Sequence, residues 1–147
     1  MTHNHSCCRD AVATKMTPNR QLVLSLLQNS GKPLSAYELL DCLREQGIQW
    51  QPPTAYRALD YLVAQGFAHY LQSIQKYVVC PHQGCDHFSQ LLICVSCGQV
   101  LEAAMAPELL DLLSQQVAAR GFKLAPQFLE LKGMCCNCQR ESSCGEN

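Results

Sequence analysis

Four cysteines stand in two C-x-x-C pairs about 40 residues apart in this 147-residue chain. The first pair is Cys94 and Cys97, and the second pair is Cys135 and Cys138. Four thiolates arranged in two such pairs commonly hold a tetrahedral zinc ion, because a tight turn aims two sulfur atoms at one point. Cysteines that merely fill a core have no reason to recur in spaced pairs. We therefore expect one closed zinc site here, with Cys136 as a competing thiol inside the second pair.

A second group of donors begins on a predicted hairpin formed by residues 67–80. If this hairpin closes between Ile74 and Gln75, His69 and Cys80 lie directly opposite each other on one face. Directly opposed residues have Cβ atoms only ~5 Å apart, which is close enough for His69 and Cys80 to bind the same ion.

His87 and Glu102 can complete this second site as a tetrahedron of nitrogen, sulfur and oxygen donors. A thiolate at Cys80 favours zinc over iron, because soft sulfur ligands suit zinc better than Fe(II) or Mn(II). His82 and Cys85 remain competing donors in the same stretch. The sequence alone leaves the choice among them open.

The 11 cysteines of the chain bear on its compartment as well as on its ligands. No run approaches the ~18 apolar residues of a spanning helix, and the start MTHNHSCC lacks the features of a secretory signal. We therefore expect a cytoplasmic protein whose reduced thiols bind metal or do redox chemistry, without a disulfide framework. A redox C-x-x-C follows a strand and begins a helix, and we expect neither pair to have that context.

The first half of the chain must position the hairpin donors. Its sequence pattern predicts three helices, over residues 17–31, 35–47 and 52–66. Thr17 is the expected N-cap of the first helix, and Ser35 and Glu38 form a capping box at the second. Prolines stand only at the entrance of the third helix, which exposes Tyr56, Arg57 and Tyr61. Three short helices followed by a hairpin indicate a winged helix-turn-helix.

The second half predicts three strands, over residues 90–94, 99–102 and 128–132, and one amphipathic helix over residues 107–120. The apolar residues expected on the buried side of that helix are Leu109, Leu110, Leu113 and Val117. One helix and three strands are too few to bury both faces of a sheet. We therefore expect a partner, of which a symmetric dimer is the simplest form.

Charge is divided unevenly between the halves. Residues 1–80 carry a formal charge of +2 and residues 81–147 a charge of −3. The first half is thus the better candidate for contact with an anionic polymer.

The sequence resembles the ferric uptake regulator family, and within it the zinc uptake regulator subgroup, from about Thr17 to Cys138. The motifs that carry the resemblance are TPNRQLVLSLL, SAYELLDCLRE, PPTAYRALDYLVAQGF, YVVC, HFSQLLICVSCGQVLE and GMCCNC. The resemblance implies an α+β chain with a winged-helix DNA-binding domain (1–82), a hinge (83–89) and an α/β dimerisation domain (90–147). It implies a repressor of zinc-uptake genes, not an enzyme, that binds operator DNA as a homodimer when zinc is bound.

The resemblance also assigns residues. It implies two zinc ions per chain, a structural one at Cys94, Cys97, Cys135 and Cys138, and a regulatory one at His69, Cys80, His87 and Glu102. The implied DNA-contacting residues are Arg57, Tyr37, Tyr56 and Thr54. Asp41 and Arg44 occupy positions where two dimers can pair on one operator. The N-terminal HNHSCC lies outside the resemblance.

Three alternatives to a zinc-responsive repressor remain open from the sequence. An iron- or peroxide-responsive regulator would share the fold. A zinc-ribbon interaction protein that does not switch would need only the four paired cysteines. A thiol-redox enzyme would need an exposed cysteine with a low pKa beside a base.

Overall fold

The computed structural model describes residues 16–80, 88–124 and 128–143, with side chains as far as residue 140. The chain divides into two compact units, Met1–Cys85 and Asp86–Asn147, which are described separately. Residues 81–87, which hold His82, Cys85, His87 and most of the predicted hinge, lie outside the described residues, as does the N-terminal HNHSCC.

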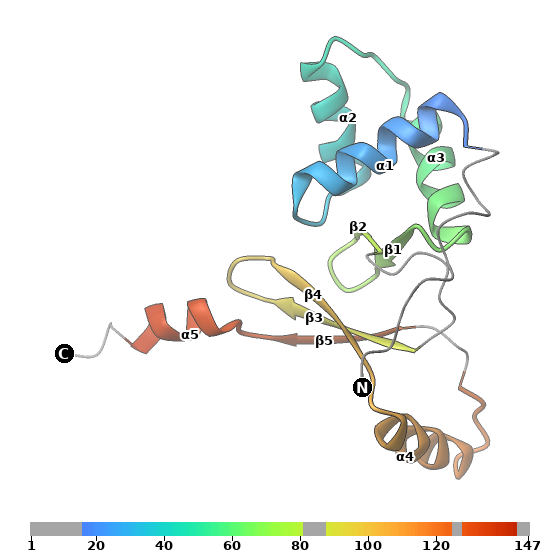
Figure 1. Cartoon of the computed structure of the whole chain (residues 1–147), viewed down its shortest axis with the longest axis vertical. Coiled ribbons are helices and arrows are strands. Elements are labelled where there is room, and N and C mark those ends of the chain that lie inside the picture. Colours follow the sequence, from blue (N-terminus) through green and yellow to red (C-terminus); the bar gives the residue numbers. More distant parts are fainter. Residues whose placement is uncertain (1–15, 81–87, 125–127, 144–147) are drawn as a thin grey trace, which may run out of the picture. The chain divides into compact units, whose positions relative to one another are not determined.

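Three helices form most of the first unit: α1 (Pro18–Ser30), α2 (Ala36–Glu45) and α3 (Pro52–Ala64) (Figure 1). The predicted capping box of α2 is present, with Ser35 Oγ accepting from the Glu38 backbone N–H and Glu38 Oε2 accepting from the Ser35 N–H. Thr17 is the N-cap residue of α1, but its side chain makes no capping hydrogen bond. Gly31 ends α1 with a φ of 62°, a conformation that glycine adopts without strain.

Apolar residues from the facing sides of the three helices build the core of this unit. The largest fully buried side chains of the helices are Val23, Leu39, Leu43, Leu59 and Leu62. Small residues, Ala55 and Ala58, are also buried on α3, which allows close approach of its neighbours. The predicted helix-turn-helix is confirmed, with α3 as its second helix.

A hairpin follows α3 and consists of β1 (Ala68–Leu71) and β2 (Lys76–Val79). Its observed register pairs His69 with Val78 and Ala68 with Val79. The predicted pairing of His69 with Cys80 is therefore wrong by two residues, because the turn is centred between Ser73 and Ile74. Gln75 adopts a positive φ of 54° in this turn. A bridge between Leu34 and Tyr77 joins the hairpin to the segment between α1 and α2.

The second unit contains a three-stranded sheet of β3 (Ser89–Cys94), β4 (Val100–Ala104) and β5 (Phe128–Gly133). Strand β3 lies in the centre, antiparallel to β4 and parallel to β5. All three predicted strands are thus confirmed. Two helices accompany the sheet, α4 (Pro107–Ala118) and α5 (Cys136–Ser143), and the sequence did not predict α5.

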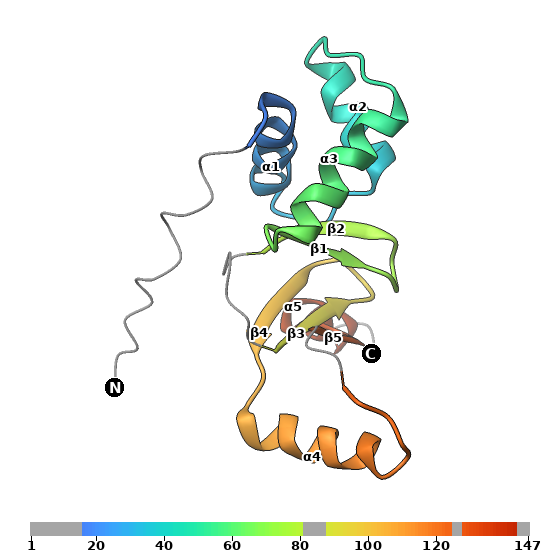
Figure 2. The ribbon, with the colours of Figure 1, turned by 90° about the vertical axis from the view of Figure 1, so that its right-hand side faces the viewer.

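Helix α4 has no buried residue in this chain, although its apolar residues were predicted on a buried side. Leu109 is 49% exposed, whereas Leu110, Leu113 and Val117 are half-buried. Figures 1 and 2 show α4 beyond the end of β4 instead of flat against the sheet. The helix is therefore amphipathic as predicted, but the described part of this chain does not bury its apolar side.

Among the described residues, no helix combines the length and the apolar character that crossing a membrane requires.

Candidate metal centres

The parallel pairing of β3 with β5 brings the two C-x-x-C pairs to the same edge of the sheet. Cys94 is the last residue of β3 and lies opposite Gly133, the last residue of β5. The Val95 backbone N–H donates to the Gly133 carbonyl at 2.9 Å, which holds the two chain segments together just before they turn. Because parallel strands end at the same side of a sheet, the cysteines at and just beyond these two strand ends converge.

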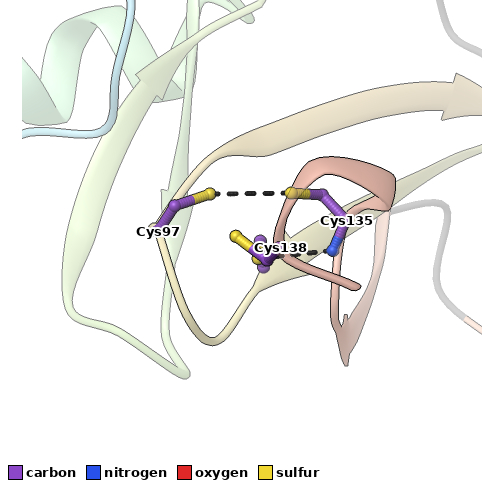
Figure 3. Close-up of side chains that lie close together, drawn as sticks. Cys97, Cys135 and Cys138 are labelled. Atoms are coloured by element: carbon purple, nitrogen blue, oxygen red, sulfur yellow. Dashed lines mark hydrogen bonds between the residues drawn. The ribbon is translucent and has the colours of Figure 1, made fainter. Parts of the chain in front are cut away.

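The ligand atoms of Cys94, Cys97, Cys135 and Cys138 all lie within 4.8 Å of one another. The sulfur atoms of Cys97 and Cys135 are 3.8 Å apart, and Figure 3 shows the thiols of Cys97, Cys135 and Cys138 turned toward one another. A tetrahedron with zinc–sulfur bonds of ~2.3 Å has edges of ~3.8 Å. The four thiols therefore suit a single tetrahedral metal ion, and four protein ligands leave no open position on it.

The thiols of the cluster differ in acidity. The Cys135 backbone N–H donates to the Cys94 sulfur at 3.4 Å and, with further backbone donors of the turn, lowers the pKa of Cys94 to about 6. Hydrogen bonding to the Cys135 sulfur, followed by burial, raises the pKa of Cys138 to about 12. Without metal, the cluster thus stabilises one thiolate readily and resists forming more.

Cys136 does not belong to this cluster. Its side chain is exposed, and its sulfur lies 3.7 Å from Asn137 Oδ1. Of the three cysteines at the second pair, Cys135 and Cys138 belong to the cluster and Cys136 does not.

The prediction that neither C-x-x-C follows a strand and begins a helix is wrong for the second pair. Cys135 follows β5 and its carbonyl accepts from the Gln139 N–H in the first turn of α5. A redox pair in this context would act with its own two sulfurs. Here two further sulfurs from the first pair lie within the same cluster, which favours metal binding over redox chemistry.

Two of the predicted regulatory donors lie together on the hairpin of the first unit. His69 and Cys80 are two residues off direct opposition and share a face, and their ligand atoms lie within 4.8 Å. Cys80 continues the ladder beyond β2 by donating its N–H to the Phe67 carbonyl at 2.9 Å. A nitrogen and a sulfur donor thus converge on one point of the hairpin, as diagonal neighbours in a sheet can.

Glu102 belongs to the second unit, where it lies on β4 directly opposite Leu91. His87, the remaining donor, lies outside the described residues.

The predicted DNA-contacting side chains gather on α2 and α3. Arg57 is exposed on α3, Tyr56 beside it is 39% exposed, and Tyr37 on α2 is 66% exposed. Thr54 is half-buried in the first turn of α3. Thr54, Tyr56 and Arg57 thus lie in the first two turns of the second helix of the helix-turn-helix, the part that reads base edges in this motif.

Asp41 and Arg44 are both on α2 and form an ion pair with each other at 2.6 Å. Their side chains are 63% and 64% exposed. Both groups are therefore accessible, and within the chain each already has a partner of opposite charge.

Residues 11–132 match the model of the ferric uptake regulator family. The zinc uptake regulation protein of Escherichia coli strain K12 is 40% identical over 131 residues, which are 88% of this chain and 76% of that protein.

Solved structures give the same result. A zinc uptake regulator complexed with zinc and DNA has a TM-score of 0.79 at 40% identity, covering 88% of this chain and 87% of that chain. The crystal structure of holo XcZur has a TM-score of 0.76 at 39% identity, covering 90% of this chain and 92% of that chain. With its winged helix-turn-helix and its converging C-x-x-C pairs, this chain belongs to the ferric uptake regulator family.

Proposed function

We propose that this chain is a zinc-responsive transcriptional repressor that binds operator DNA as a dimer when a regulatory zinc ion is bound. The genes under its control are those of zinc uptake and homeostasis. The observation that carries the proposal is the nitrogen and sulfur pair of His69 and Cys80, on the hairpin next to the helix-turn-helix. The similarity to a zinc uptake regulator solved with zinc and DNA supports it.

Each chain binds two zinc ions in this proposal. Cys94, Cys97, Cys135 and Cys138 hold a structural ion, whose four thiolates tie β3 and β5 to α5 and contribute directly to folding. A site closed in this way keeps its metal when zinc becomes scarce. It therefore stabilises the second unit but does not report the zinc supply.

His69, Cys80, His87 and Glu102 hold the regulatory ion. His69 and Cys80 belong to the DNA-binding unit, and Glu102 belongs to the unit that forms the dimer. An ion that is bound by residues of both units sets the angle between the two units. That angle sets the separation of the two α3 helices in a dimer. Both helices must reach successive major grooves ~34 Å apart. A coupling free energy of about 1–3 kcal/mol between zinc and DNA suffices for a switch of tenfold or more.

Arg57 reads a guanine from the major groove through two hydrogen bonds, since this is the commonest specific contact of an arginine with a base. Tyr37, Tyr56 and Thr54 contact the DNA around it. Asp41 and Arg44 are exposed enough to exchange their mutual ion pair for pairs between neighbouring dimers, so that two dimers occupy one operator.

A competitive metal titration with DNA present tests this function. Metal-free regulatory sites are filled with Zn(II), Fe(II) or Mn(II), and binding is measured on a duplex that the zinc-loaded chain enriches from a random-sequence pool. We expect Zn(II) to activate binding at the lowest free concentration. Activation by Fe(II) or Mn(II) in preference to zinc would identify a regulator for another metal, and metal-independent binding would remove the sensing function.

A further inference from the structure

Arg20 of α1 stacks on Tyr61 of α3, with its guanidinium carbon 3.5 Å from the centre of the ring. Tyr61 follows Arg57 by four residues, so both side chains leave α3 on nearly the same face and one turn apart. The guanidinium of Arg20 therefore lies beside the face of α3 that carries Arg57, although it comes from a different helix.

The charge of Arg20 is not neutralised within the described part of its unit. Residues 16–80 contain five basic side chains, of which Arg44 pairs with Asp41 and Lys76 pairs with Glu38. No ion pair involves Arg20 among these described residues. A stacked arginine uses the flat face of the guanidinium on the ring and keeps its N–H groups, which lie at the edge, available for an anion.

When DNA is bound at this surface, the nearest anion to such a group is a phosphate of the DNA backbone. In protein–DNA complexes, half to two-thirds of the hydrogen bonds go to phosphate and sugar, and phosphates flank the groove in which α3 would lie. A planar guanidinium matches two phosphate oxygens. We propose that Arg20 binds a phosphate beside the groove that Arg57 enters, and that Tyr61 is the positioning residue for Arg20. This inference rests on the proposed DNA-binding function.

The salt dependence of DNA binding tests the assignment. Each phosphate contact contributes about 0.9 to the slope of log K against log salt concentration. A dimer carries two copies of Arg20, so Arg20→Gln should reduce the magnitude of that slope by about two. At 0.15 M salt, the same rule predicts a loss of roughly fivefold per contact and roughly thirtyfold per dimer. The base preference of the variant should stay unchanged, because a phosphate carries no sequence information.

The probe is a duplex that the zinc-loaded wild-type chain enriches from a random-sequence pool, titrated between 50 and 200 mM salt. Arg20→Lys should recover most of the slope, since it keeps the charge. Tyr61→Phe should bind like the wild type because it keeps the ring, and Tyr61→Leu should lose affinity while keeping most of the slope. Arg120→Gln is the matched control, since it removes the same charge from the second unit and should leave the slope unchanged.

Thermal unfolding of each variant separates the assignment from a role in folding alone. If Arg20→Gln lowers the unfolding midpoint but keeps the wild-type salt slope, Arg20 only joins α1 to α3 and the inference is wrong. A changed base preference in Arg20→Gln would also overturn it. If the wild-type chain enriches no duplex at all, the proposed function fails and this inference fails with it.

Discussion

Each of the four clustered thiols in the second unit must lose its proton before it can bind zinc as a thiolate. Cys94 begins close to that state, because backbone N–H groups around its sulfur lower its pKa to about 6. Cys138 lies at the other extreme, with a pKa raised to about 12. At neutral pH, metal binding therefore has to displace protons from the cluster.

We predict that the structural site binds zinc more tightly as the pH rises from 6 to 9. Every displaced proton contributes up to a tenfold gain in apparent affinity per pH unit. Competition with a coloured chelator at pH 6, 7, 8 and 9 measures the effect. The predicted sign follows from Cys138, which is protonated throughout this range without metal. An affinity that is independent of pH would show that the four thiols are not the ligands.

His69 and Cys80 lie close together in the structure, although the strand register from which this was predicted is wrong. The sequence placed His69 opposite Cys80, whereas the structure places it opposite Val78. A shift of two residues keeps each side chain on its face, while a shift of one would have turned one donor away. His69 and Cys80 therefore still meet as diagonal neighbours. The four-residue turn carries no strong signal such as Asn-Gly that would have fixed its centre.

One carboxylate joins the hairpin to α2. Lys76 Nζ on β2 lies 2.8 Å from Glu38 Oε1, while the other oxygen of Glu38 accepts from the Ser35 N–H at 2.7 Å. Lys76 and then the Ser35 backbone lower the pKa of Glu38 to about 2. Since Glu38 adjoins Tyr37, this link connects the hairpin that carries Cys80 with a predicted DNA-contacting residue.

We predict that Glu38→Gln reduces stability at neutral pH by roughly 1 kcal/mol, since the pair is partly exposed and screened by solvent. The folded-state pKa of Glu38 lies below its ordinary value of 4.5. Its contribution is therefore present above pH 4.5 and is lost as the pH falls toward 2. Urea unfolding between pH 2 and 7 should show a flatter profile for the variant in that window. Glu45→Gln, at the exposed end of α2, should keep the wild-type profile, and equal profiles for both variants would contradict the role of the Lys76 pair.

The elements themselves differ in how far the sequence could predict them. Helices α1 to α3 carry caps, prolines at their starts and glycines near their ends, so their bounds follow from local chemistry. Helix α5 was missed because its sequence CNCQRESS has no apolar periodicity, and the helix forms where the chain leaves β5 beside the cysteine cluster. The periodicity of α4 predicts which residues share its apolar side but not whether that side is buried, because burial depends on what packs against the helix, and none of its residues is buried in this chain.

The second unit leaves a row of leucines on one face of its sheet. Leu92 lies directly opposite Leu101 on β4 and opposite Leu131 on β5, so the three side chains share that face. Leu101 is 60% exposed and Leu131 is 42% exposed. Exposed apolar rows of this kind mark protein–protein contact, and a second copy of the chain is the partner that the proposed function requires.

We predict that Leu131→Lys weakens the dimer by on the order of a hundredfold, because an uncompensated charge in an apolar interface costs several kcal/mol. Analytical ultracentrifugation over a range of concentrations measures the dissociation constant. Gln115→Lys, on the polar side of α4, adds the same charge and should remain dimeric. If Leu131→Lys dimerises as tightly as the wild type, this sheet face is not the contact between copies.

In the proposed function one zinc ion per chain is structural and the other controls DNA binding, and the Cys80→Ser variant separates these two roles. Zinc per chain and zinc-dependent binding to the enriched duplex are measured on the same sample, with Cys42→Ser as a control for loss of a thiol that belongs to neither described cluster. We expect Cys80→Ser to be a folded dimer with one zinc ion per chain and no zinc-dependent DNA binding, while Cys42→Ser keeps two ions and normal binding. Full zinc-responsive binding by Cys80→Ser would show that Cys80 does not bind a regulatory ion.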